Sequence, residues 1–362
     1  MNILFIAPLP PPIHGQSYVS NELLIGLKKN HNVKVVNFTK KRNAGRLYFI
    51  KRYFEVFDVL YSIWKQRKGV DAIYLTISQS FLGNLKDLIT YLIFRSNLDK
   101  ITIHLHGGAI RKELWNKLPI LLRFNRYFLR KFNGIIISGE SHKEVFTDLV
   151  REEKIFTVPN FAPASMFIAP DQLNSKFGKL NPLRVLYVSG MRTKKGYLDL
   201  LEGYRSLSST EQKVIQVDFA GEFETDSEKE AFLKIIQQYD NLKYHGVIDD
   251  VSKTTLFEQS HVFCLPTKYL EGQPISILEA YASGCLVLTT NLGGIVDIFK
   301  EELNGFQTRV NDPKSIADRI RYCAENPAKV HKIAEANSKL ALDNYQLDVF
   351  VNSIDEIIVN NK

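Results

Sequence analysis

Short hydrophobic runs rich in Val, Ile and Leu alternate with helical patterns along nearly the whole chain. The runs are continuously apolar, which is typical of strands buried on both faces of a parallel sheet. We expect strands at 2–7, 33–37, 72–77, 101–105, 134–138, 155–158, 184–189, 215–220, 242–245, 262–265 and 286–289. Helical patterns, such as those at 17–29, 197–206, 227–239 and 313–325, lie between them. This repetition predicts an α/β fold of doubly wound sheets.

One segment interrupts the alternation. Pro, Ala, Ser, Asn and Lys replace the pattern between Phe161 and Pro182, so we place an inter-domain linker at 166–182. The chain is then divided into a first domain at 1–165, a second at 183–344, and a C-terminal helix at 345–362 that packs back on the first domain. Two such domains facing across a cleft would bind a ligand beyond the carboxyl ends of their strands.

Composition narrows the class of protein. Hydrophobic residues make up 45% of the 362 residues and charged residues 24%, the usual mix of a globular protein. We find no apolar run near the roughly 18 residues that a membrane-spanning helix needs, and no basic segment precedes the apolar start as in a secretion signal. The cysteines, Cys264, Cys285 and Cys323, have no disulfide or zinc spacing. These features predict a cytoplasmic protein.

The most informative stretch, 265–284, has the pattern of a strand, a loop and a short helix. Glu271 falls in the loop and Glu279 inside the helix, whose first turn suits Pro274 and whose end suits Gly284. The break before Pro274 would let both carboxylates turn toward one ligand. Incidental glutamates of an amphipathic helix are the alternative. Against it, an unpaired Glu279 in an otherwise apolar segment would be costly.

This frame, Glu-Gly-x-Pro-x-x-x-x-Glu-Ala-x-Ala-x-Gly, resembles the signature of the retaining glycosyltransferases of family 4, which have the GT-B fold of two Rossmann-like domains. Four other segments resemble the family's motifs in the same order: Pro10-Pro-Pro-Ile-His-Gly15-Gln16-Ser17, His104-Leu-His106-Gly107-Gly108, Val158-Pro159-Asn160 and Ser189-Gly-Met-Arg192-Thr-Lys-Lys195-Gly196. The resemblance covers nearly the whole chain. It implies an acceptor-binding first domain and a donor-binding second domain.

The resemblance also implies an activity. The protein would move a sugar from a UDP- or GDP-sugar to a hydroxyl of a glycan or polyprenyl-linked acceptor, with retention of anomeric configuration, in bacterial-type surface polysaccharide assembly. No Asp-x-Asp pair stands near a strand end, and cationic side chains can neutralise the leaving diphosphate. We therefore expect no metal and no other cofactor.

By the same resemblance, several residues of the second domain would bind the donor. Lys195 would neutralise the diphosphate, and Arg192 would substitute for the usual arginine, whose place Gly190 occupies. Glu279 would accept hydrogen bonds from the ribose hydroxyls. The transferred sugar would contact Glu271 and the segment Gly272, Gln273, Pro274 and Ile275.

The first domain would complete the site. Gly15 and Gln16 would approach the diphosphate, and His106 would face the donor sugar near its reacting carbon. His106, Glu271 and Lys195 are thus the expected catalytic residues. We leave out His104, which we expect on the opposite side of the strand.

Positive charge is concentrated in the first half. Residues 1–170 hold 25 Lys and Arg against 12 Asp and Glu, whereas the remainder holds 22 against 27. Basic and aromatic residues mix at 40–54 and again at 111–131, where Arg123, Arg126 and Arg130 share a face. Such faces are typical of helices that dock on anionic lipid, so we expect peripheral association with the inner face of the cell membrane. A solvated basic face is the alternative, and no nucleic-acid-reading module is recognisable.

Two other functions stay open. A nucleotide-sugar epimerase of similar two-lobed fold would turn over the donor without an acceptor, and a non-catalytic subunit would bind the nucleotide sugar without turnover. A dehydrogenase is disfavoured because the Gly-x-Gly-x-x-Gly fingerprint is missing after the first strand. The base, the sugar and the acceptor stay open as well.

Overall fold

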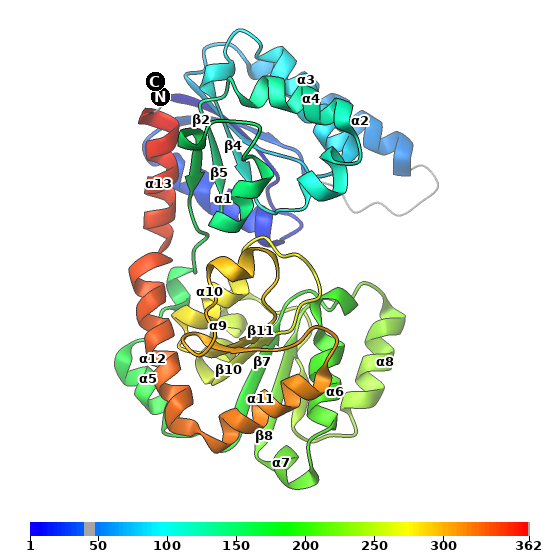
Figure 1. Cartoon of the computed structure of the whole chain (residues 1–362), viewed down its shortest axis with the longest axis vertical. Helices are drawn as coiled ribbons and strands as arrows, with labels where there is room; N and C mark the ends of the chain where they lie inside the picture. Colours follow the sequence, from blue (N-terminus) through cyan, green and yellow to red (C-terminus); the bar gives the residue numbers. More distant parts are fainter. Residues whose placement is uncertain (40–47, 361–362) are drawn as a thin grey trace. The chain divides into compact units, whose positions relative to one another are not determined.

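The computed structural model describes residues 1–39 and 48–360, which form two compact units (Figure 1). One unit contains Met1–Asn160 together with Leu347–Lys362, and the other contains Phe161–Gln346. Each unit is built on a six-stranded, fully parallel sheet with flanking helices. The predicted α/β fold with two doubly wound sheets is therefore confirmed.

The first unit has the strand order β2-β1-β3-β4-β5-β6. Its strands are β1 (Asn2–Ala7), β2 (Asn32–Asn37), β3 (Ala72–Thr76), β4 (Ile101–Leu105), β5 (Gly134–Ile137) and β6 (Ile155–Thr157). Its main helices are α1 (Gly15–Leu27), α2 (Tyr48–Gln66), α3 (Phe81–Ile93), α4 (Pro119–Leu129) and α13 (Leu347–Asn360). Every residue of β3, β4 and β5 is buried, which explains their continuous apolar sequences.

The second unit has the strand order β12-β11-β10-β7-β8-β9. Its strands are β7 (Leu183–Val188), β8 (Ile215–Ala220), β9 (Leu242–Tyr244), β10 (Val262–Leu265), β11 (Leu286–Thr289) and β12 (Gly305–Gln307). Its helices are α5 (Pro170–Phe177), α6 (Tyr197–Arg205), α7 (Ser209–Lys213), α8 (Asp226–Ile236), α9 (Asp250–Gln259), α10 (Ile275–Ala282), α11 (Pro313–Glu325) and α12 (Pro327–Asn344). Strand β12 was not predicted, because three residues carry too short a hydrophobic pattern.

The segment expected as a linker, 166–182, contains helix α5 and is part of the second unit. Leu173 and Phe177 of α5 are buried. The Nζ atom of Lys176 donates to the carbonyl oxygens of Ser283 and Gly284, at 2.8 and 3.0 Å. The division between the units instead follows Asn160.

Helix α13 returns to the first unit (red in Figure 1), where it contacts α1, β3 and β5. Its residues Phe350, Ile354 and Ile358 are buried. Gly26 of α1 permits the close approach, because a Cβ atom there would lie 2.5 Å from Val351 Cγ1. Among the described residues, no helix is both long and apolar enough to cross a membrane.

Candidate functional site

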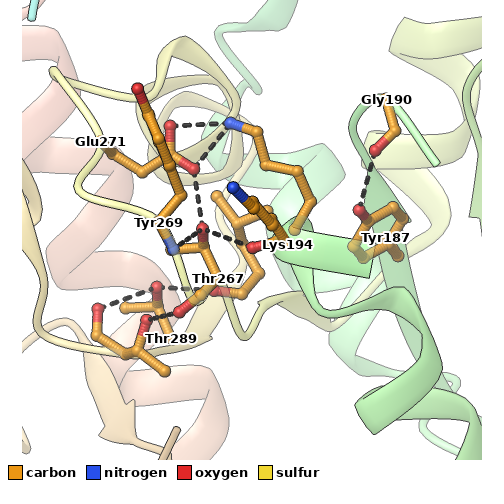
Figure 2. Close-up of polar contacts among 10 residues, drawn as sticks. Tyr187, Gly190, Lys194, Thr267, Tyr269, Glu271 and Thr289 are labelled. Atoms are coloured by element: carbon orange, nitrogen blue, oxygen red, sulfur yellow. Dashed lines mark hydrogen bonds and ion pairs between the residues drawn. The ribbon is translucent and has the colours of Figure 1, made fainter. Parts of the chain in front are cut away.

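The expected donor-binding residues Lys195 and Glu271 form an ion pair in the second unit. The Nζ atom of Lys195 lies 2.6 Å from Oε1 and 2.7 Å from Oε2 of Glu271. Glu271 is only 7% exposed. The hydroxyl of Thr267 donates to Glu271 Oε1 at 2.8 Å and accepts from the backbone N–H of Tyr269 at 3.2 Å (Figure 2). The carboxylate and the ammonium are thus held in one place before any ligand binds.

The loops that carry this pair follow β7 and β10, which are neighbours in the sheet. The backbone N–H of Lys268 donates to the Lys194 carbonyl at 2.8 Å, which ties the two loops together. Gly196 has a φ of 82°, and a Cβ atom there would lie 2.0 Å from the Pro266 carbonyl oxygen. Only glycine therefore fits directly after Lys195.

A third loop supports Glu271 from the end of β11. The backbone N–H of Gly294 donates to the Glu271 carbonyl at 2.9 Å. Gly293 has a φ of 58°, and a Cβ atom there would lie 2.3 Å from the same carbonyl oxygen. Sequence reasoning missed Thr267, Gly293 and Gly294, although a Gly-Gly pair a few residues after a buried strand was a usable signal.

Glu279 lies on α10 and is 4% exposed. Its Oε1 accepts from the Nζ atom of Lys253 on α9 at 2.8 Å. Burial by itself would lower the pKa of Lys253, but the nearby Glu279 carboxylate raises this pKa above its ordinary value. Glu279 is therefore a charge-balanced buried carboxylate. Nothing local in the sequence marks Lys253 as its partner, because the pairing is tertiary.

The segment between the two glutamates forms the start of α10. Helix α10 begins at Ile275, so Pro274 is its N-cap residue and not part of the first turn. No side chain caps this helix start, which leaves backbone N–H groups for a ligand oxygen. Gly272 is half-buried and Gln273 is buried.

Arg192 is not joined to the Lys195–Glu271 pair through its side chain. Its Nε lies 3.2 Å from Glu224 Oε1, and both side chains are more than half exposed. Such surface pairs contribute little stability, so Arg192 can exchange partners at small cost. Gly190, at the place of the family's usual arginine, accepts a hydrogen bond from the Tyr187 hydroxyl through its carbonyl (Figure 2).

In the first unit, His106 directly follows β4, and its ring lies against that of His104, with 3.9 Å between the ring centroids and a tilt of 32° between the ring planes. The expectation that His104 points to the opposite side was wrong, since residues two apart on a strand share a face. His104 Nδ1 lies 2.7 Å from the Tyr74 hydroxyl, whereas the Nε2 atoms of both histidines are buried and have no hydrogen-bond partner among the described residues. Burial lowers the pKa of His106 to about 3. It also lowers that of His104 well below its usual range, so both are neutral at physiological pH.

Gly15 and Gln16 form the start of α1. His14 caps this helix: its Nδ1 accepts from the Ser17 N–H at 3.2 Å, and its own N–H donates to the Ser17 hydroxyl at 3.0 Å. Gly15 is exposed, and Gln16 lines a cavity of about 680 Å³.

The three arginines expected at a membrane have different surroundings. Arg126 pairs with Asp148 at 2.9 Å and Arg130 Nε donates to the Leu149 carbonyl at 3.1 Å, whereas Arg123 is exposed. The apolar residues near them that belong to the core are Trp115, Leu121, Leu129 and Phe132. The basic stretch at 40–47 lies outside the described residues.

Comparison with known proteins adds a family match. Residues 171–340 match the family model described as glycosyl transferases group 1. The chain is 23% identical to the capsular polysaccharide biosynthesis glycosyltransferase CapH of Staphylococcus aureus, over 63% of this chain and 61% of the relative. It is 27% identical to CapM of the same organism, over 51% and 50%. The matched region thus spans about half to three fifths of these relatives.

The fold is also similar to that of solved structures. Anabaena HepE, in its complex with UDP-glucose, matches 99% of this chain and 100% of its own with a TM-score of 0.75 at 16% identity. Together the matches show that residues 171–340 are similar to group 1 glycosyl transferases and that the chain shares its fold with HepE, as the GT-B resemblance implied.

Proposed function

We propose that the chain is a retaining, metal-independent glycosyltransferase of family 4 that transfers a sugar from a UDP- or GDP-sugar to a hydroxyl of a glycan or polyprenyl-linked acceptor. The observation that carries this proposal is the Lys195–Glu271 pair, held at the ends of neighbouring strands in a unit that matches glycosyl transferases group 1. The UDP-glucose complex of HepE supports the donor class. The names of CapH and CapM support a role in surface polysaccharide assembly.

The charges of the second unit fit the needs of the donor. When the bond between the sugar and the diphosphate breaks, negative charge develops on the leaving phosphate oxygen and needs a fixed cation. An ammonium has three N–H donors, so Lys195 can serve a phosphate while it still holds Glu271. Arg192 supplies a second, movable cation, and no metal is required. Glu279, with Oε1 held by Lys253, would use Oε2 to accept from the ribose hydroxyls.

His106 takes a role that suits a neutral ring. Because its pKa is about 3, the His106 ring carries no charge and would form hydrogen bonds with the donor sugar near its reacting carbon. The acceptor oxygen then bonds to that carbon from the face that the diphosphate leaves. The acceptor's proton passes to a phosphate oxygen of the leaving group.

We also propose that the chain docks on a membrane, through a surface that extends beyond the three arginines. Helix α2 packs beside α3, and α3 beside α4 (Figure 1). The large apolar side chains that these helices expose are Tyr53, Phe54, Phe57, Tyr61, Trp64, Phe81, Leu85, Leu92, Ile120, Phe124 and Tyr127. Along α3 and α4, all of whose residues are described, the only charged residues that are not buried are Arg123, which is exposed, and Arg126, which is half-buried. An apolar surface with basic residues is typical of interfacial binding to anionic lipid.

Calorimetric titration with UDP and GDP, followed by mass detection of sugar transfer from the matching donors, tests the function. We expect one nucleoside diphosphate to bind and its sugar to be transferred. Conversion of the donor to an epimer would favour the epimerase alternative. Binding without turnover under any condition would favour a non-catalytic subunit.

A further inference from the structure

Thr267 adjoins the Lys195–Glu271 pair, just after the end of β10 (Figure 2). The residue is fully buried. Its carbonyl oxygen accepts from the hydroxyl of Thr290 at 2.6 Å, and Thr290 directly follows the neighbouring strand β11. Its own hydroxyl lies 3.3 Å from the carbonyl oxygen of Lys194, in the loop after β7 on the other side. Thr267 is therefore held from both strands that flank β10.

The direction of the Thr267 hydroxyl follows from its partners. A hydroxyl has one proton to donate and two lone pairs that accept. One lone pair accepts from the backbone N–H of Tyr269 at 3.2 Å. The proton has two acceptors within reach, Glu271 Oε1 at 2.8 Å and the Lys194 carbonyl oxygen at 3.3 Å. The carboxylate is closer and charged, and hydrogen bonds to charged groups are the stronger ones. The proton therefore points to Oε1 of Glu271.

As a consequence, the two oxygens of Glu271 are not equivalent. Each carboxylate oxygen offers about two lone-pair sites. Oε1 accepts from Thr267 at 2.8 Å and from Lys195 Nζ at 2.6 Å, which occupies both of its sites. Among the described residues, Oε2 accepts only from Lys195 Nζ, at 2.7 Å. Oε2 thus keeps one site for a ligand, and the ligand group must be a hydrogen-bond donor.

Thr267 also limits the rotation of this carboxylate. The ammonium of Lys195 is a compact point charge with rotatable donors, so by itself it does not fix the plane of the carboxylate. The backbone of Glu271 is held by the N–H of Gly294 at 2.9 Å, and its side chain is only 9% exposed. The hydroxyl of Thr267 adds the directional contact that distinguishes Oε1 from Oε2.

We propose, on the basis of the glycosyltransferase function above, that Thr267 is a positioning residue for the transferred sugar. It occupies Oε1 of Glu271 and so presents Oε2 to one hydroxyl group of that sugar. The contacted position of the sugar then carries a free hydroxyl, because a fluoro, methoxy or carboxylate group there cannot donate to Oε2. Thr267 therefore contributes to binding of the sugar and not to binding of the nucleotide.

Calorimetry on the full chain tests this, with UDP, GDP, UDP-glucose, UDP-galactose, UDP-N-acetylglucosamine and GDP-mannose as ligands. Thr267→Val keeps the shape of the side chain but removes the hydroxyl. Affinity for the nucleoside diphosphate should be unchanged, whereas affinity for the matching nucleotide sugar should fall about tenfold to a hundredfold, as for the loss of a hydrogen bond to a charged group. Thr267→Ser should restore it.

Thr289→Val is the matched control. Thr289 is equally buried, and its hydroxyl donates to the Leu265 carbonyl oxygen at 2.8 Å, away from Glu271. Both affinities should be unchanged in this variant. Urea denaturation checks that each variant is folded, and Thr267→Ala takes the place of Thr267→Val if the latter is not.

Donor analogues with fluorine in place of single hydroxyls then identify the contact. In the wild type, one analogue should bind at least about tenfold more weakly than the parent sugar nucleotide. In Thr267→Val this difference should largely disappear, because groups that act through one contact have non-additive effects. A merely structural role would instead weaken the nucleoside diphosphate and all donors alike.

Equal losses for nucleoside diphosphate and nucleotide sugar, or undiminished discrimination among the fluoro analogues in the Thr267 variant, overturn the inference. Donor binding and sugar transfer by the wild type would still support the proposed function in that case. A wild type that binds none of the nucleotide sugars refutes the proposed function itself, and the inference with it.

Discussion

Replacing Glu279 by Gln separates two effects that this carboxylate would have, on the nucleotide and on stability. The amide keeps the shape of the side chain but removes the charge that pairs with Lys253 at 2.8 Å. If Glu279 accepts hydrogen bonds from the ribose, the loss of a charged acceptor costs about 1.5–3 kcal/mol. With 1.4 kcal/mol per factor of ten, affinity for the nucleoside diphosphate should fall about tenfold to a hundredfold.

The same substitution leaves the ammonium of Lys253 without its main counter-charge. Breaking a buried pair from one side costs about 3–5 kcal/mol, and the side chain of Lys253 is 18% exposed, so we expect the lower end of that range. The double variant Lys253→Met/Glu279→Gln removes both charges and should recover most of the stability. These changes in the free energy of unfolding can be measured by urea denaturation of the wild type, the single variants Glu279→Gln and Lys253→Met, and the double variant.

Calorimetry with UDP and 2′-deoxy-UDP, or with the guanine pair if GDP is the ligand, then isolates the ribose contact. The wild type should prefer the ribonucleotide, and Glu279→Gln should lose that preference. The double variant should be stable and also lack the preference. If the stable double variant still discriminated the 2′-hydroxyl as the wild type does, Glu279 would have a purely structural role and the assignment would be refuted.

Other expectations follow from individual contacts. Lys195→Met should reduce donor turnover far more than affinity for the plain nucleoside, because its charge acts on the diphosphate; an equal loss of both, measured by calorimetry and turnover, would contradict this. Folding stability should fall as the pH drops from about 6.5 toward 3, because burial depresses the pKa of His106 to about 3 while the unfolded chain takes up the proton near pH 6.5. His106→Gln should reduce the loss between pH 7.5 and 5 by up to about 2 kcal/mol in urea denaturation, and an unchanged loss would refute a buried neutral ring. Gly196→Ala should sharply lower nucleotide affinity, since its Cβ would lie 2.0 Å from the Pro266 carbonyl oxygen. Gly246→Ala is the control, because Gly246 has a similar φ of 72° but open space around it. Replacing Phe57, Tyr61 and Trp64 by Ser should release the chain from acidic vesicles in sedimentation assays more than Arg123→Gln does, and retained binding would favour a merely solvated surface.

All of the strands except β12 could be predicted, because most of them are buried and have a continuous apolar sequence. The motifs around Lys195 and Glu271 led us to expect both in one site, but they did not predict the direct ion pair between the two side chains. Lys253 and Thr267 escaped prediction because their links to the glutamates depend on how α9 and the loops fold together. Helix α5 escaped because its polar residues concealed the buried Leu173 and Phe177.

Retaining transfer from a nucleotide sugar can be tested by following candidate UDP- and GDP-sugars by proton NMR in real time, with EDTA present and water as the acceptor. We expect slow release of the nucleoside diphosphate and a free sugar that first appears with the anomeric configuration of the donor. Lys195→Met should abolish this release. First appearance of the opposite anomer, epimerisation of the donor without release of the nucleotide, or a strict requirement for a divalent metal would contradict it.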